Sequence, residues 1–116
     1  MVVSRNLILL RSHKIVIEVR ILKTLIEPDI EMIKAIATLK DGSVLNVSEA
    51  EGTDWREYSY HWQKNEKLIR RWDNAPHHRN LPNFPHHVHD KKRVMSCEDS
   101  NLVDVLAYIE MQIKKD

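Results

Sequence analysis

Six of the seven histidines in the chain lie between residues 61 and 89, close to arginines, an aspartate and aromatic side chains. Imidazole transfers protons near neutral pH, and the planar guanidinium group binds phosphate oxygens through two parallel hydrogen bonds. A metal-free ribonuclease needs these groups: a base for the 2′-hydroxyl, an acid for the leaving oxygen, and cations for the charge that develops on the phosphoryl group. The composition of this region therefore favours chemistry on a phosphodiester.

Under a nuclease interpretation, Arg70 and Arg71 contact phosphate, and one of His61 or His78 transfers a proton. Asp73 orients an imidazole or holds Arg71. The catalytic candidates are His61, Arg70, Arg71, Asp73, His77 and His78. Candidates for stacking on bases or contacting phosphate are Trp62, Trp72, Phe84, Lys92 and Arg93.

The second interpretation of the histidines is a metal site, because imidazole is a common zinc ligand. Side chains of adjacent residues in an extended segment point apart, so each His-His pair offers one ligand. His87 and His89 are two residues apart and share a side. The candidate ligands are His86, His87 and His89, with zinc as a candidate divalent metal, although the nuclease interpretation requires no cofactor.

Each of these residues also has a structural interpretation. Tyr58, Tyr60, Trp62 and Trp72 fit the core of a sheet, and Asp73-Asn74 before Ala75-Pro76 fits a turn. The basic run at residues 91–93 is typical of a solvated strand edge that prevents unwanted pairing. Cys97 fits an ordinary buried thiol.

The elements that must position these residues are mainly strands. Alternating apolar residues predict a strand over residues 15–25, and two β-prone runs, 32–39 and 44–48, flank Asp41-Gly42, which predicts a type I′ hairpin turn. A second hairpin pairs residues 58–63 with 68–73. If Gln63 pairs with Leu68, His61 lies opposite Arg70 and Tyr60 lies opposite Arg71.

The remaining segments complete an α+β fold. Residues 74–90 are expected to form a loop rich in proline and histidine, and residues 92–97 a last strand. Apolar residues at helical spacing predict a C-terminal helix that Ser100 or Asn101 caps. We expect one domain over residues 1–116, an antiparallel β-meander of five to six strands with the C-terminal helix on one face. Residues 4–12 fit either a short helix or an extension of the first strand.

Composition narrows the class of protein further. Residues 54–95 contain nine Lys/Arg and five Asp/Glu, a local charge of +4, while the whole chain carries +1. The one cysteine excludes an internal disulfide and fits a reducing compartment. The apolar run at residues 6–10 is too short for a signal peptide or a membrane span. We therefore expect a cytoplasmic protein without membrane contact.

Three strings carry a resemblance to a known family: His-Trp-Gln at residues 61–63, Arg-Arg-Trp-Asp-Asn-Ala-Pro-His-His at 70–78, and Pro-Asn-Phe-Pro-His-His-Val-His-Asp at 82–90. Together they resemble the signature of the TumE family of toxin–antitoxin proteins. The resemblance covers residues 55–113 well and the N-terminal half weakly. It implies a growth-inhibiting toxin of a prokaryotic type II toxin–antitoxin pair, with a cognate antitoxin as its protein partner, and it implies no mechanism.

The sequence thus predicts a toxin that inhibits growth through RNA cleavage, with RNA as a second partner. The alternative is a non-enzymatic module that binds nucleic acid or protein, in which the histidine-rich loop is structural or binds metal. Such a module would bind nucleic acid with steep salt dependence and leave it intact. A metal-dependent hydrolase would instead lose activity with a chelator. A homodimer is compatible with each of these interpretations.

Overall fold

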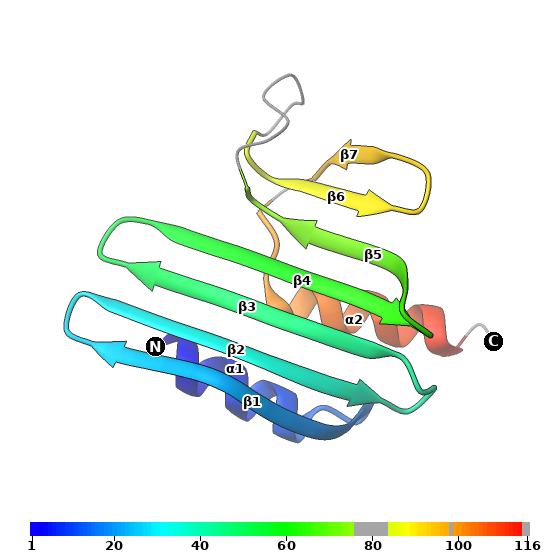
Figure 1. The fold of residues 1–116 in the computed structure, drawn as a ribbon, viewed down its shortest axis with the longest axis horizontal. Coiled ribbons are helices and arrows are strands. Elements are labelled where there is room, and N and C mark those ends of the chain that lie inside the picture. The colour runs from blue at the N-terminus through cyan, green and yellow to red at the C-terminus, as the bar shows by residue number, and fades with distance from the viewer. Residues whose placement is uncertain (76–83, 98, 115–116) are drawn as a thin grey trace.

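The computed structural model describes residues 1–75, 84–97 and 99–114. The elements are α1 (Val2–Ser12), β1 (Val16–Glu27), β2 (Ile30–Leu39), β3 (Val44–Gly52), β4 (Arg56–Lys64), β5 (Lys67–Asp73), β6 (His87–Asp90), β7 (Val94–Ser96) and α2 (Leu102–Lys114). The strands form one antiparallel sheet in chain order, so each strand pairs with the next along the sequence (Figure 1). This confirms the predicted α+β antiparallel meander with a C-terminal helix, but the described sheet has seven strands and not the five to six expected.

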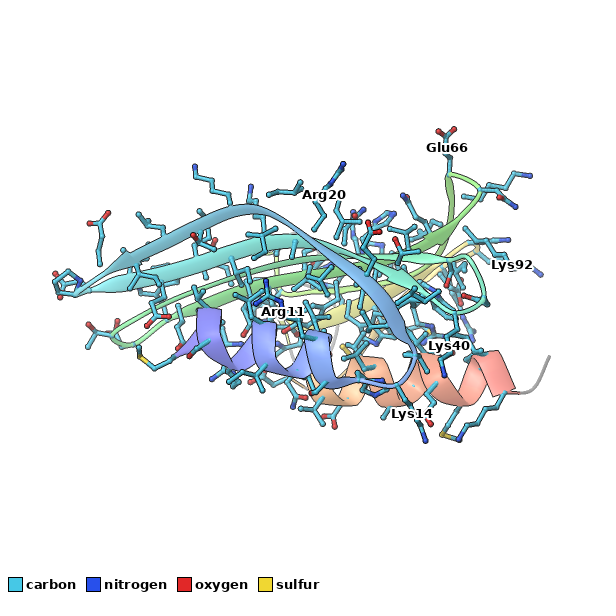
Figure 2. The ribbon with its side chains drawn as sticks, turned by 90° about the horizontal axis from the view of Figure 1, so that it is seen from below. Arg11, Lys14, Arg20, Lys40, Glu66 and Lys92 are labelled. Atoms are coloured by element: carbon cyan, nitrogen blue, oxygen red, sulfur yellow. The ribbon has the colours of Figure 1, made fainter. Side chains whose placement is uncertain are left out.

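Both helices lie on the same side of the sheet, and the opposite face carries none of the described helices (Figure 2). Helix α1 packs against β1, β2 and β3. Helix α2 packs near β5, where the ring of Tyr108 meets Trp72 edge-on with 5.5 Å between centroids. The molecule therefore has a core between sheet and helices, and an open sheet face. The open face displays Arg20 and Glu66 (Figure 2).

The core forms because apolar residues alternate along the strands and recur at helical spacing in α2. The buried members include Ile33, Ala35, Ala37 and Leu39 of β2, Leu45 and Val47 of β3, Tyr58, Tyr60 and Trp62 of β4, and Leu102, Val105, Leu106 and Ile109 of α2. The interpretation of the tyrosines and tryptophans as sheet core is therefore confirmed. Asn101 caps α2, because its Oδ1 accepts the backbone N–H of Asp104 at 2.9 Å.

Both predicted hairpins exist, but their turns differ from the prediction. Between β2 and β3, only Gly42 has a positive φ, +85°, so the predicted type I′ turn is wrong. The backbone N–H of Leu39 bonds to the Ser43 carbonyl, which closes a three-residue loop with glycine in the left-handed position. Between β4 and β5, Asn65 and Glu66 both have positive φ, 53° and 66°, which is the geometry of a two-residue type I′ turn.

Two other segments settle or correct the expectations. Residues 2–12 form a helix, which decides the alternative left open for the N-terminal segment. The expected loop over residues 74–90 is wrong at its end, because His87–Asp90 form β6 and pair with β5. The strand expected at residues 92–97 is the shorter β7. Among the described residues, no helix is long and apolar enough to cross a membrane.

Candidate functional site

The open face of the sheet carries two polar rows that run across neighbouring strands. Because pairing partners in a sheet point to the same face, the register defines each row. One row consists of Lys34, Ser48, Ser59, Asp73 and His87, on β2 to β6. The next row consists of Asn46, His61, Arg71 and His89, on β3 to β6. Five side chains that could transfer protons, bind phosphate or hold a metal therefore share one face of three adjacent strands. They are His61, Arg71, Asp73, His87 and His89.

The predicted pairing of His61 with Arg70 is wrong, because β5 contains one extra residue. Gln63 pairs with Leu68 as expected, but Trp62 pairs with Arg70 and not with Ile69. This bulge shifts the rest of the register by one position, so His61 lies opposite Arg71 and Tyr60 lies opposite Trp72. A one-residue shift exchanges the two faces of a strand.

Arg70 therefore lies on the helix-covered face, away from the histidines. Its guanidinium lies 4.7 Å from the centre of the Tyr108 ring and 5.9 Å from that of Trp72. Such cation–π contacts give Arg70 a packing role on α2. Arg71, the next residue, points to the open face, so the two adjacent arginines have different surroundings.

Asp73 is the centre of the cluster on the open face. Its Oδ2 lies 2.8 Å from Nε of Arg71 and 3.8 Å from Nε2 of His89, and its Oδ1 lies 2.6 Å from Nε2 of His87. Oδ1 also accepts the backbone N–H of Ala75 at 3.1 Å. The carboxylate is buried, so it orders three side chains from β5 and β6 in a place where solvent screens little. The expectation that Asp73 holds Arg71 is confirmed as a contact.

His61 and His89 flank Arg71 on either side. The backbones of β4 and β6 are two strand spacings apart, roughly 10 Å, and Arg71 lies between them. Nη2 of Arg71 lies 3.5 Å from Nε2 of His89. Burial lowers the pKa of His61, and the positive charge of Arg71 lowers it further, against a smaller opposing effect of Gln63. His61 is therefore held as a neutral imidazole near pH 7.

Three residues of the cluster could hold a metal ion. One ligand atom each from Asp73, His87 and His89 lies within 4.8 Å of the others. Nδ1 of His87 lies 2.8 Å from the Pro85 carbonyl oxygen, which only accepts hydrogen bonds, so Nδ1 carries a proton. Nε2 of His87 lies 2.6 Å from Oδ1 of Asp73, so a proton lies between these two atoms, and a metal ion bound here would replace that proton.

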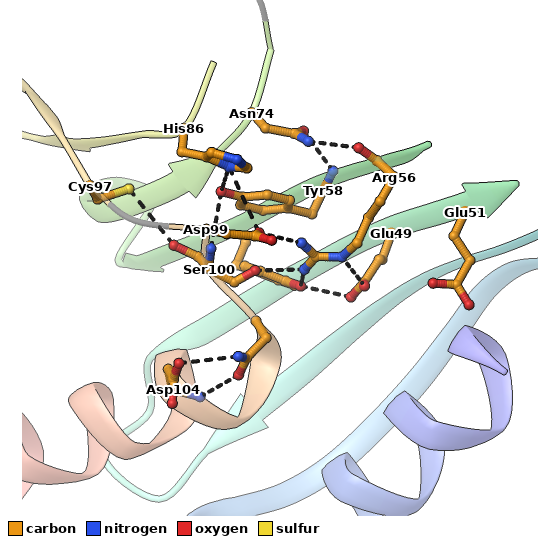
Figure 3. A network of polar contacts seen from close by, with 12 residues as sticks. Glu49, Glu51, Arg56, Tyr58, Asn74, His86, Cys97, Asp99, Ser100 and Asp104 are labelled. Atoms are coloured by element: carbon orange, nitrogen blue, oxygen red, sulfur yellow. Dashed lines mark hydrogen bonds and ion pairs between the residues drawn. The ribbon is translucent and has the colours of Figure 1, made fainter. Parts of the chain in front are cut away.

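His86, the third ligand expected from the sequence, lies apart from this group. Its Nδ1 lies 2.8 Å from the Tyr58 hydroxyl, and its ring stacks on Tyr58 with 5.8 Å between centroids. It thereby belongs to a second polar network, which lies on the helix-covered side of the sheet (Figure 3). The adjacent His86 and His87 side chains point apart, as expected for an extended segment.

The second network is built around a buried carboxylate, Glu49, which is only 2% exposed. Glu49 accepts hydrogen bonds from Tyr60 Oη at 2.7 Å, Arg56 Nε at 2.8 Å, Asn6 Nδ2 at 2.9 Å and Arg5 Nη2 at 3.3 Å. Burial alone raises the pKa of Glu49, but the bonds from Tyr60, Arg56 and Asn6 outweigh it, and the net direction is downward. Glu49 therefore stays ionised and ties α1 to the sheet.

Arg56 extends this network to the start of α2. It bonds to Asp99 Oδ1 and to the Ser100 carbonyl, both at 2.6 Å, and its guanidinium lies 4.4 Å from the Tyr58 ring centre (Figure 3). Cys97 lies at its edge, 3.8 Å from the Ser100 hydroxyl, and burial raises the pKa of its thiol. Neither Glu49 nor Arg56 was predicted from the sequence to take part in a site. The available signal was the position of Glu49, in phase with the apolar Leu45 and Val47.

The remaining residues predicted from the sequence are buried, exposed, or outside the described part of the chain. Trp62 and Trp72 are buried, and Trp62 donates its indole N–H to Ser43 Oγ at 2.9 Å, so neither ring presents a face to a base. Lys92 and Arg93 are exposed in the β6–β7 turn, where their backbone N–H groups bond to Asp90. Phe84 is 40% exposed. His77 and His78 lie outside the described residues.

A comparison with protein-family models gives one match, described as Toxin TumE, over residues 6–113. The chain belongs to this toxin family. Neither the curated proteins nor the solved structures yield a match. The TumE match includes residues 6–12 of α1 and every strand of the described sheet, so it extends the resemblance seen in residues 55–113 into the N-terminal half. Membership of a toxin family implies an antitoxin partner.

Proposed function

We propose that this TumE protein inhibits growth by cleaving RNA on the open face of β4, β5 and β6. The observation that carries the proposal is the row formed by His61, Arg71 and His89, in which a guanidinium lies between two imidazoles. A cation flanked by two proton-transfer groups fits the cleavage of an RNA phosphodiester. The phosphate needs charge stabilisation, the 2′-hydroxyl must lose a proton, and the leaving 5′-oxygen must gain one.

His61 is the base in this proposal. It removes the proton of the 2′-hydroxyl, and the 2′-oxygen forms a bond to phosphorus. Its lowered pKa supports this role, because a base must be neutral before it accepts a proton. The 2′,3′-cyclic phosphate that forms keeps the charge of the original diester.

His89 is the acid, and Arg71 is the phosphate ligand. The bond from phosphorus to the 5′-oxygen breaks, and protonated His89 gives that oxygen its proton, which leaves a 5′-hydroxyl end. Nε of Arg71 contacts Asp73, so its terminal nitrogens are the part of the fork directed to other acceptors. Arg71 is thereby fixed before the substrate binds.

Asp73 and His87 position these groups and take no part in the two proton transfers. His87 is 1% exposed, which removes it from direct reach of an RNA strand. Its contacts with Asp73 and with the Pro85 carbonyl fix the carboxylate that holds Arg71 and lies beside His89. Both are therefore positioning residues.

A metal-dependent hydrolase is the second candidate, and the Asp73–His87–His89 group favours it. Zinc–nitrogen bonds of about 2.0–2.1 Å place tetrahedral ligands roughly 3.3 Å apart, which small side-chain shifts reach here. A bound zinc would activate a water molecule for attack on phosphorus. Titration calorimetry with zinc tests this: tight binding that His87→Ala and His89→Ala both abolish, with RNA cleavage lost in EDTA and restored by zinc, favours the metal form.

The test of the main proposal uses purified protein and single-stranded RNA in EDTA. We expect cleavage with 2′,3′-cyclic phosphate ends, and losses of at least 100-fold in rate for His61→Ala and for His89→Ala. Arg20→Ala, on the same face of the sheet but on β1, serves as the control with an unchanged rate. Intact RNA after prolonged incubation, with or without zinc, would refute cleavage and favour the non-enzymatic binding module.

A further inference from the structure

A groove of about 800 Å³ lies beside the cluster on the open face, and Arg71 and Asp73 belong to both. Its lining comes from β2, β3, β4, the end of β5 and residues 84–85. Three small side chains on neighbouring strands, Ser48, Ala50 and Ser59, belong to this lining and leave the sheet hollow there. A space of this volume is large enough to admit a flat ring over the sheet.

Two aromatic residues line the same groove and expose much of their surface. Trp55 is 42% exposed and Phe84 is 40% exposed, whereas Trp62 and Trp72 are buried. An exposed indole in a groove is available for stacking, which accounts for about 1–3 kcal/mol per base in single-strand binding. Phe84 was predicted from the sequence for this role, whereas Trp55, which follows the β3–β4 turn, was not.

The backbone of Gly52 supports the Trp55 indole. A Cβ atom built on Gly52 would lie 2.1 Å from Nε1 and 2.5 Å from Cε2 of the indole, so the ring occupies the space that any other residue would fill. The Gly52 N–H also donates to the Trp55 carbonyl oxygen at 3.0 Å, which closes the turn. The indole is therefore held against the turn and is preorganised for stacking.

The charges of the groove fit the backbone of a nucleic acid. Lys34 lines it, and Arg71 lines it next to the proposed cleavage position. The Asp73 charge is already engaged by Arg71 and His87. Glu57, the other acid of the lining, only accepts hydrogen bonds, so it suits the N–H groups of a base edge and not a phosphate.

We infer that this groove binds an unpaired nucleobase of a single-stranded RNA substrate, stacked on Trp55, in the same RNA strand as the phosphate held by Arg71. The inference rests on the proposed ribonuclease function and names the substrate of that site. Single-stranded RNA is favoured over a duplex, because paired bases present no free ring face to an indole. The groove thus selects an unpaired nucleotide a short distance from the cut.

The experiment measures binding without cleavage. A single-stranded RNA with 2′-O-methyl groups lacks the nucleophile, so it binds without being cut, and tryptophan fluorescence reports on the exposed Trp55. We expect quenching and saturable binding by wild type, a loss of affinity of about tenfold in Trp55→Ala, and a smaller loss in Trp55→Phe. Gly52→Ala keeps the ring but displaces it, so it also weakens binding. Met111→Ala, exposed on α2, is the unchanged control.

The possible failures of the two proposals are distinguishable. Quenching and Trp55-dependent binding with no cleavage of natural RNA would refute the proposed ribonuclease activity and support base binding in the groove. Cleavage with normal affinity and no quenching in wild type, or equal affinity for a duplex, would refute base binding in the groove and support the ribonuclease activity. Trp55→Phe and Gly52→Ala keep the test decisive if Trp55→Ala fails to fold, and circular dichroism of each variant checks its fold.

Discussion

Glu49 gives the most quantitative prediction about the fold, because its surroundings are fully defined. In Glu49→Gln the side chain keeps its shape but loses its charge and one of its two acceptor oxygens, while Arg56 and Arg5 keep their positive charges. Removing one partner of a buried charge pair costs about 3–5 kcal/mol. Arg56 retains Asp99 and the Ser100 carbonyl as partners, so we expect the lower end, about 3 kcal/mol.

Thermal and urea unfolding followed by circular dichroism measure this loss. At about 4 °C per kcal/mol for a chain of this size, Tm should fall by roughly 12 °C. Glu51→Gln is the matched control: Glu51 lies on the same strand and has ion-pair contacts with Arg5 and the N-terminus at 3.7–3.8 Å, but it is more accessible. Its loss should stay below about 1 kcal/mol. Equal effects of the two substitutions would refute the assignment of Glu49 as a buried clamp.

The pH dependence of stability in wild type and Glu49→Gln tests the direction of the Glu49 pKa shift. The pKa of Glu49 is lowered in the folded protein, so its contribution to stability is complete above its unfolded value of about 4.3 and is lost as pH falls through the folded pKa. The stability difference between wild type and Glu49→Gln should therefore be largest at neutral pH and shrink below about pH 4. A difference that grows on acidification would contradict this reasoning.

Three further predictions concern separate parts of the molecule. Arg71→Gln should raise the pKa of His61 toward its ordinary value, because it removes a nearby positive charge, and histidine NMR titration would show no change if that charge has no effect. Glu66→Gly should stabilise the protein by about 1 kcal/mol in urea unfolding, because Glu66 has a φ of 66°, and a loss of stability would argue against the type I′ turn. Leu106→Ala should destabilise it by about 2–5 kcal/mol, because Leu106 is fully buried, and a cost below 1 kcal/mol would show that α2 packs loosely.

Sequence patterns predicted the elements better than their register. The apolar alternation in β4 and the helical spacing in α2 depend on local chemistry, so the core and the C-terminal helix followed from them. The bulge at Ile69 does not follow from local chemistry, because the periodicity of β5 alone does not predict that Trp62 pairs with Arg70. That single residue decides which of the two adjacent arginines joins the histidines.

The sequence predicted which residue types the candidate site contains, but only some of the residues that come together in it. His61, Arg71 and Asp73 come together with His87 and His89, which sequence analysis had assigned to a separate metal site. The reason is that β6 was hidden in a segment that looked like a loop, and only its pairing with β5 places its histidines beside Asp73. Long-range pairing of a four-residue strand leaves little trace in composition.

The most direct test of the account compares Arg71→Gln with Arg70→Gln in cells that express the toxin. The two residues are neighbours in sequence but lie on opposite faces of β5, so the pair separates the open face from the packed one. We predict that wild type and Arg70→Gln arrest growth and fragment total RNA, whereas Arg71→Gln, folded to the same extent, does neither. Growth arrest and RNA fragmentation by folded Arg71→Gln, or arrest by wild type with intact RNA, would contradict the account.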